Sequence, residues 1–267
     1  MLSINPKDLE IPQLHRYLLG AIGPRPIAFA STIDADGVPN LSPFSFFNVF
    51  SANPPIMVFS PARSGRTGAT KNTLDNVKNV KEVVINVVNH DIVQQMSLAS
   101  SPYEAGIDEF VKAGLTPVAS ELIKPFRVKE SPVQFECKVN EIIELGQNGG
   151  AGNLVICEVV KIHINEDVLD ANGMIDQHKI DLVSRMGGNW YCRADKNSMF
   201  EVKKPITTIG IGVDQIPTEV RNSTILTGND LGLLGSVEAI PTQEEVAAFD
   251  APNGESHQIA KELLAKN

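Results

Sequence analysis

The residues best suited to chemistry lie in one loop, at residues 61–73, where cationic and hydroxyl side chains gather. These side chains belong to Arg63, Ser64, Arg66, Thr67, Thr70, Lys71 and Thr73. Guanidinium, ammonium and hydroxyl groups are the usual donors to a phosphate dianion. A helix that follows the loop, capped by Thr70 or Asn72, would aim its positive end at the same anion. The loop therefore predicts a phosphate site, although a loop of this composition can also be a plain solvated connection.

A polar and aromatic stretch, SPFSFFN at residues 42–48, precedes this loop, and a short apolar strand at residues 56–59 separates the two. Serine and asparagine bond nearby backbone groups, which leaves backbone amides free to face a ligand. A flavin needs such donors, because reduction places negative charge near N1 and the C2 carbonyl of its ring. The two stretches together suggest a site for flavin mononucleotide (FMN). The alternative is that the phenylalanines belong to the core.

Several ordered blocks of the sequence resemble the flavin reductase-like family with the FMN-binding split barrel, a group that includes flavoredoxins. The blocks are PRPIAFAST at 24–32, D-x-x-G at 34–37, NLSPFSFFN at 40–48, PPIMVFS at 54–60, KNTLDNV at 71–77 and VVINVV at 83–88. A later block, SRMGGNWY at 184–191, also matches. The resemblance therefore extends over most of the first 195 residues.

The resemblance implies an FMN cofactor, and with the residue chemistry it predicts which positions contact the flavin. Ring contacts are expected from Ser45, Phe46, Phe47 and Asn48. Phosphate contacts are expected from Arg63, Arg66, Thr67, Lys71 and Thr73. Further cofactor contacts are expected from Phe29, Ser31, Thr32, Ser60, Asn72 and Arg185.

Two of these positions need comment. Many relatives carry tryptophan where this chain has Phe29, so this residue departs from the family pattern. The resemblance places Arg185 beside the cofactor, in contact with either the flavin or a nicotinamide substrate. The pair Gly187 and Gly188 in the same block could instead form a plain turn.

Runs of strand type separated by turns predict a mainly β protein, an antiparallel split β-barrel with added helices. Strands are expected at residues 27–33, 38–41, 56–59, 82–88, 133–140 and 153–164. Helices are expected at residues 7–22, 73–79, 90–98 and 108–113. No G-x-G-x-x-G follows a strand and no P-loop sequence occurs, so neither a Rossmann domain nor a P-loop fold is supported.

Two strands carry more specific predictions. Alternation along residues 133–140 places Gln134, Glu136, Lys138 and Asn140 on a wet face. Residues 154–160 are apolar on both faces, which predicts burial by another element or by a partner subunit.

The family resemblance divides the chain into a split-barrel domain at residues 1–195 and a C-terminal extension at residues 196–267. The extension holds enough isoleucine, leucine and valine to pack, and we expect it to lie on the barrel or on the partner subunit. It contains a strand-like run, ITTIGIGV at 206–213, and a final polar helix at about 256–265. Its LTGNDLG segment is either a turn or a second binding loop.

Composition excludes several classes of function. The 267-residue chain has a net charge of -9 with no basic patch, which argues against nucleic acid and anionic membranes as partners. No apolar run approaches the ~20 residues of a membrane span and no export signal is apparent, so a cytoplasmic location is expected. The 3 cysteines form no C-x-x-C, and Cys137 and Cys157 are expected to be buried. No metal site is predicted.

The resulting prediction is an NAD(P)H-dependent flavin reductase, in which NADH or NADPH delivers hydride to FMN and no acid–base residue is required. The electrons would pass to a small molecule or another protein. The resemblance also implies a homodimer with flavin sites at the subunit interface. Two alternatives are a flavoredoxin-like electron carrier without nicotinamide turnover, and a barrel that has lost flavin and serves as an interaction module.

Overall fold

The chain was studied as a computed structural model that describes residues 1–104, 106–250, 252 and 254–265. It divides into two compact units, Met1–Met199 and Phe200–Asn267. The packing of the extension on the barrel or on a partner stays a prediction. Among the described residues, no helix is both long enough and apolar enough to span a membrane.

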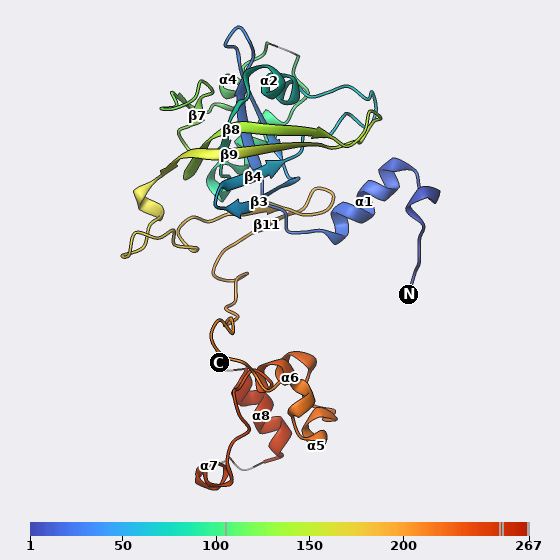
Figure 1. Cartoon of the computed structure of the whole chain (residues 1–267), viewed down its shortest axis with the longest axis vertical. Coiled ribbons are helices and arrows are strands. Elements are labelled where there is room, and N and C mark those ends of the chain that lie inside the picture. The colour runs from blue at the N-terminus through green and yellow to red at the C-terminus, as the bar shows by residue number, and fades with distance from the viewer. Residues whose placement is uncertain (105, 251, 253, 266–267) are drawn as a thin grey trace. The chain divides into compact units, whose positions relative to one another are not determined.

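An antiparallel sheet dominates the first unit, as predicted (Figure 1). Its seven strands run in the order β2-β1-β5-β8-β9-β4-β3. Their bounds are β1 Ala28–Ile33, β2 Pro39–Phe44, β3 Phe47–Ala52, β4 Pro55–Phe59, β5 Glu82–Asn86, β8 Val133–Glu144 and β9 Asn153–Ile164. Two small sheets pair β6 (Pro117–Val118) with β7 (Arg127–Val128) and β10 (Val183–Arg185) with β11 (Tyr191–Arg193).

Helices form where the sequence predicts them, and the last three pack on strands of the sheet. They are α1 (Ile11–Ala21), α2 (Asn72–Val80), α3 (Val93–Ala99) and α4 (Glu109–Ala113), with short 3-10 turns at η1 (Pro6–Asp8), η2 (His90–Ile92) and η3 (Glu166–Val168). The predicted cap of α2 is wrong. Lys71 holds the N-cap position without a side-chain cap, Asn72 is the first helical residue, and the Thr70 hydroxyl donates to Asp75 instead.

The two larger hydrophobic clusters of this unit lie on its main sheet, and a third, smaller one joins Val133, Val168 and Ile180. One holds Phe59, Leu74, Ile85 and both Cys137 and Cys157. The other includes Phe29 and joins β1 to α3 and α4. The burial of both cysteines confirms their predicted role as small apolar side chains.

The predicted wet face of β8 is wrong at two positions, because Gln134 and Glu136 are buried. The carboxylate of Glu136 accepts backbone N–H groups of Glu121 at 2.8 Å and Leu122 at 2.7 Å, and it lies 2.7 Å from Nε2 of His163. Burial alone would raise the pKa of Glu136, but these donors outweigh it and lower the pKa. The segment before β7 thus covers this face, while Lys138 and Asn140 are exposed as expected.

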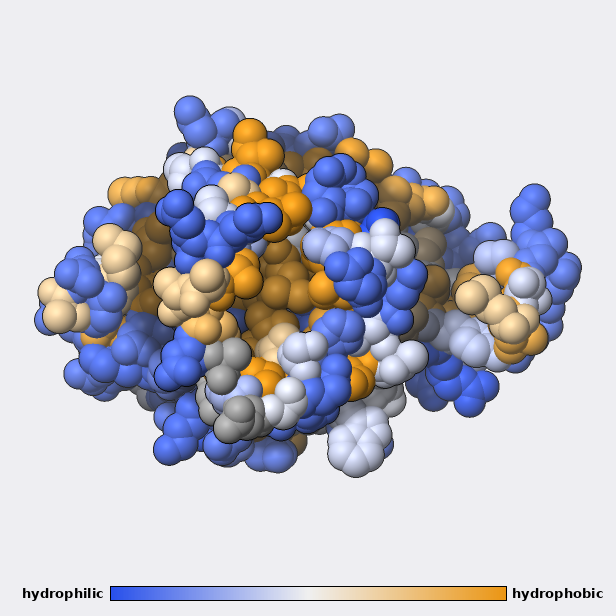
Figure 2. All heavy atoms as spheres, turned by 90° about the horizontal axis from the view of Figure 1, so that it is seen from below, coloured by the Kyte–Doolittle hydropathy of each residue, from blue (hydrophilic) through white to orange (hydrophobic). Residues whose placement is uncertain are grey.

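The second unit is helical, with η4 (Val213–Gln215), α5 (Thr218–Arg221), α6 (Gly228–Leu234), α7 (Gln243–Ala248) and α8 (Ser256–Leu264). The predicted strand at 206–213 is wrong, because no strand forms there, whereas the final helix is confirmed. Thr227 and Asp230 make a capping box, so the LTGNDLG segment starts α6. Figure 2 shows the molecule from below, where hydrophobic and hydrophilic residues both reach the surface.

Candidate functional site

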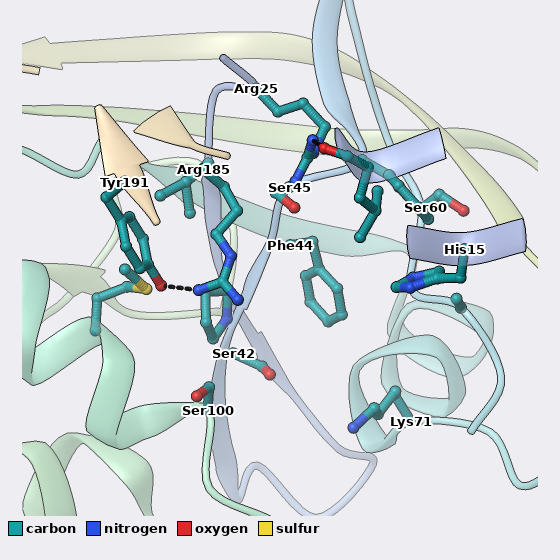
Figure 3. Close-up of a pocket in the computed structure, with 16 residues that line it drawn as sticks. His15, Arg25, Ser42, Phe44, Ser45, Ser60, Lys71, Ser100, Arg185 and Tyr191 are labelled. Atoms are coloured by element: carbon teal, nitrogen blue, oxygen red, sulfur yellow. Dashed lines mark hydrogen bonds between the residues drawn. The ribbon is translucent and has the colours of Figure 1, made fainter. Parts of the chain in front are cut away.

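A cavity of about 350 Å³ opens in the first unit beside α1, the end of β2, the start of α2 and the β10–β11 hairpin. Figure 3 shows its labelled side chains. The cavity is lined by His15, Leu19, Arg25, Ile27, Ser42, Pro43, Phe44, Ser45, Phe46, Ser60, Ala62, Lys71, Met96, Ser100, Arg185 and Tyr191. Its volume is in the range of small-molecule sites.

The structure brings five of the predicted cofactor residues together in this cavity. They are Ser45, Phe46, Ser60, Lys71 and Arg185. Lys71 stands at the N-terminus of α2, so its ammonium and the positive end of the helix lie at the same edge of the cavity. Of the five residues predicted to contact a phosphate, Lys71 is the one that lines this cavity.

The three predicted residues of β1 do not line the cavity. Phe29, Ser31 and Thr32 are fully buried, and Phe29 belongs to the core. The Thr32 hydroxyl accepts a hydrogen bond of 3.1 Å from the Asn76 amide on α2. These side chains therefore support the elements around the cavity.

The cationic loop lies against the turn between β8 and β9. Backbone bonds join Arg63 to Gly150 and Ala151, and the Arg63 guanidinium donates to the Glu144 carboxylate at 2.9 Å. Lys78 also pairs with Glu144, and these two cations with Gln147 lower the pKa of that carboxyl from 4.5 to about 2. Arg66 and Thr67 are exposed at the tip of the loop. Arg63 is thus neutralised here, while Lys71 has no carboxylate partner among the described residues.

The remaining predicted residues lie outside the cavity lining. Phe47 packs against the core from β3, and Asn48 is exposed and accepts the backbone N–H of Val49. Asn72 is exposed, whereas Thr73 is buried and its hydroxyl donates to Asn40 at 2.8 Å.

Sequence reasoning missed Arg25, which is only 5% exposed and lines the cavity. Its backbone exchanges both hydrogen bonds with Arg185, at 2.9 and 2.8 Å. Its guanidinium donates to the carbonyl oxygens of Leu19, Ile22 and Met186. The sequence offered only a weak signal, the position of Arg25 between two prolines at the start of the first matching block.

His15 and Leu19 were also missed, because they come from α1, which the sequence marks only as a helix before the first strand. The His15 ring contacts Phe46 edge-on, with ring centroids 6.4 Å apart. At the far end of α1, a Cβ at Gly187 would lie 3.2 Å from Cα of Gly20, so glycine allows the β10–β11 loop to approach the helix closely.

The charges around the cavity are of one sign. Arg25, Lys71 and Arg185 are cationic, and no aspartate or glutamate belongs to the lining. Phe44, Phe46 and Met96 add an apolar surface. In a protein with a net charge of -9, such a cavity suits an anion that is attached to a flat apolar group.

Known proteins resemble the chain over this unit. The sequence matches the family described as "Flavin reductase like domain" over residues 21–181. An uncharacterized protein of Aquifex aeolicus is 35% identical over 188 residues, which cover 70% of this chain and 93% of the relative.

Solved structures agree with the sequence match. Nitrilotriacetate monooxygenase component B from Bacillus cereus is 32% identical with a TM-score of 0.70, and the match covers 76% of this chain and 98% of that one. A putative flavin reductase with a split barrel domain from Shewanella frigidimarina is 28% identical with a TM-score of 0.62. The match covers 74% of this chain and 96% of that one. These likenesses confirm the predicted fold class and support a flavin-related oxidoreductase role. With its antiparallel sheet and a family match over residues 21–181, the chain belongs to the flavin reductase-like family.

Proposed function

We propose that the protein binds FMN in this cavity and acts as an NAD(P)H-dependent flavin reductase. The observation that carries the proposal is the lining itself, with three cations, no carboxylate and an apolar wall, and most of its residues lie within the region 21–181 that matches the family. When bound, FMN would supply an acceptor for hydride from NADH or NADPH. Hydride transfer needs no acid–base residue, so the role of the chain is to bind and orient.

The residues fit the two ends of FMN in different ways. Lys71 and the N-terminus of α2 offer a phosphate dianion an ammonium and backbone N–H groups. Phe44, Ser45 and Phe46 offer the ring an apolar surface together with backbone amides and a hydroxyl. Ser60 lies at the same cavity, where its hydroxyl accepts the backbone N–H of Asn153 at 3.0 Å.

The absorption spectrum of the purified full chain tests flavin binding, and stopped-flow mixing with NADH and with NADPH tests the enzyme activity. Bleaching of the band near ~450 nm, complete at catalytic rates with either nucleotide, is the expected result. A yellow protein that neither nucleotide bleaches would instead be an electron carrier. A colourless protein that takes up no added FMN would contradict the whole proposal.

A homodimer is part of the same proposal. The edge strand β3 exposes Val49 by 57% and Phe50 by 68%, and Leu154 and Ile156 on β9 are only half-buried within one chain. Exposed apolar side chains on an edge strand favour a protein partner. Light scattering should give twice the mass of one chain, and a monomer with full flavin content would refute the dimer. The cytoplasmic location stays a prediction from the sequence.

A further inference from the structure

Two arginines meet at one end of the cavity without a counter-charge. Arg25 and Arg185 are opposite one another in an antiparallel bridge, so their side chains leave the backbone on the same side. Both line the cavity, and neither has a carboxylate partner among the residues that the structure describes. Two like charges are thus held close together at the wall of a concave site.

The guanidinium of Arg25 retains unused hydrogen-bond donors. It has five N–H groups, of which three donate to the carbonyl oxygens of Leu19, Ile22 and Met186. Its Nε is buried and has no hydrogen-bond partner. A buried N–H without an acceptor is costly, so a ligand oxygen at this point would be stabilised.

Arg185 is held in place by neutral groups only. Its Nη1 donates to the Tyr191 hydroxyl, its Nη2 donates to the carbonyl oxygen of Gly188 at 2.7 Å, and its guanidinium stacks 4.7 Å from the Tyr191 ring centroid. These contacts orient the guanidinium and leave its charge intact. Burial, and then the charge of Arg185, lower the pKa of Arg25, so a bound anion would relieve both effects.

The arginine pair is separate from the end of the cavity that suits the flavin phosphate. In Figure 3, Arg185 and Tyr191 lie on one side of Phe44, and Lys71 and His15 lie on the other. One phosphate cannot neutralise both ends, because FMN carries a single phosphate at one end of the molecule. The arginine side can therefore accept a second anionic group.

We propose that Arg25 and Arg185 form a second anion subsite, which binds the phosphate or carboxylate group of the compound that exchanges electrons with the flavin. This inference rests on the proposed function and adds to it the chemistry of the co-substrate. Two sources share that chemistry: the diphosphate of a nicotinamide nucleotide, and the carboxylate of a small aromatic acid. A guanidinium fork binds either group through two parallel hydrogen bonds.

The test uses the full chain saturated with FMN, titrated calorimetrically with pyrophosphate and with benzoate at constant ionic strength. Neither probe accepts electrons from the flavin, so the readout is binding alone. The variants are Arg185→Gln and Arg185→Lys. The matched control is Arg16→Gln, which removes the same charge from an exposed residue of α1 outside the cavity lining.

We expect Arg185→Gln to weaken the binding of at least one probe by roughly 10-fold to 100-fold, the scale of a hydrogen bond to a charged group. Arg185→Lys, which keeps the charge but not the fork, should fall between Arg185→Gln and the unmodified chain, and Arg16→Gln should match the unmodified chain. A larger loss for pyrophosphate identifies a nucleotide as the source. A larger loss for benzoate identifies an organic acid.

Three results would overturn the second subsite while the proposed function stands. They are unchanged binding of both probes by FMN-loaded Arg185→Gln, an equal loss in Arg16→Gln, and release of FMN by Arg185→Gln, which would mean that Arg185 holds the flavin. Failure of the proposed flavin binding gives a different result. The unmodified chain would then show no flavin absorbance before any probe is added.

Discussion

The guanidinium of Arg25 donates a hydrogen bond of 2.8 Å to the carbonyl oxygen of Met186, although 161 positions separate the two residues in the chain. The same guanidinium bonds Leu19 and Ile22 at the end of α1. One side chain therefore joins α1, the segment before β1 and the β10–β11 loop. These are the elements that contribute His15, Arg185 and Tyr191 to the cavity.

Replacing Arg25 by alanine should destabilise this unit by about 2 kcal/mol, because three carbonyl oxygens lose a charged donor. Urea unfolding of the full chain, followed by the fluorescence of Trp190 beside the loop, measures the change. Arg16→Ala is the control, since Arg16 is exposed and has no side-chain hydrogen bond in the described structure. Equal stability of the two variants would show that Arg25 does not join these elements in solution.

Replacing Lys71 by alanine should weaken FMN binding by about 1 to 3 kcal/mol, which is roughly 5-fold to 150-fold. The reason is the loss of the only ammonium in the cavity lining, at the N-terminus of α2. Quenching of FMN fluorescence gives the affinity, with Lys129→Ala as an exposed control. Should Lys71→Ala and Arg63→Ala both bind FMN as tightly as the unmodified chain, the phosphate lies elsewhere.

Glu109 should contribute strongly to stability, because its buried carboxylate accepts the Asn40 amide and the backbone N–H of Leu41, each at 2.9 Å. Glu109→Ala leaves both donors unpaired and should cost about 2 to 3 kcal/mol. Thermal or urea unfolding against Glu104→Ala, an exposed neighbour, measures this. A Glu109→Ala chain as stable as the control would mean that water replaces the carboxylate.

The pairing of Glu144 with Lys78 and Arg63 should make part of the stability depend on acid pH. The pKa of Glu144 falls from 4.5 to about 2 on folding, so the unfolded chain binds more protons between these values. The contribution is complete above about pH 4.5 and is lost as the pH falls through about 2.

The difference in melting temperature between the unmodified chain and Glu144→Gln isolates this effect. It should be present at pH 7, shrink below pH 4.5 and decrease with added salt, because the pair is partly exposed. A difference that stays constant from pH 7 to pH 3 would show that Glu144 acts through packing and not through its charge.

The sequence predicted most strands of the main sheet and the start of α2 because their signals are local. The apolar sequence PIMVF indicates strand β4, and the sequence KNT indicates the start of α2, each from a few adjacent residues. Burial of Glu136 was not predictable in this way, because its partners at Glu121, Leu122 and His163 come from other segments. The alternation of apolar and polar residues along β8 shows to which face of the sheet a side chain points. It does not show which other segment covers that face.

The same limit explains the other errors. Arg25 became part of the site through a bridge to Arg185, and nothing near Arg25 in the sequence announces that contact. The run at 206–213 has the composition of a strand, but its backbone hydrogen bonds to residues distant in the sequence go to Gly235 and Val237, which belong to no strand. Short sequence patterns therefore predicted the structure correctly where the residues in contact are also close in the sequence.

Helix α1 forms one wall of the cavity and is only loosely attached to the rest of the unit. It buries none of its own residues, yet it supplies His15 and Leu19 to the cavity wall. It is held by the Arg25 hydrogen bonds and by close contacts at Gly187 and Gly150. Because α1 takes part in no strand pairing, a displacement of this wall would leave the hydrogen bonds of the sheet intact.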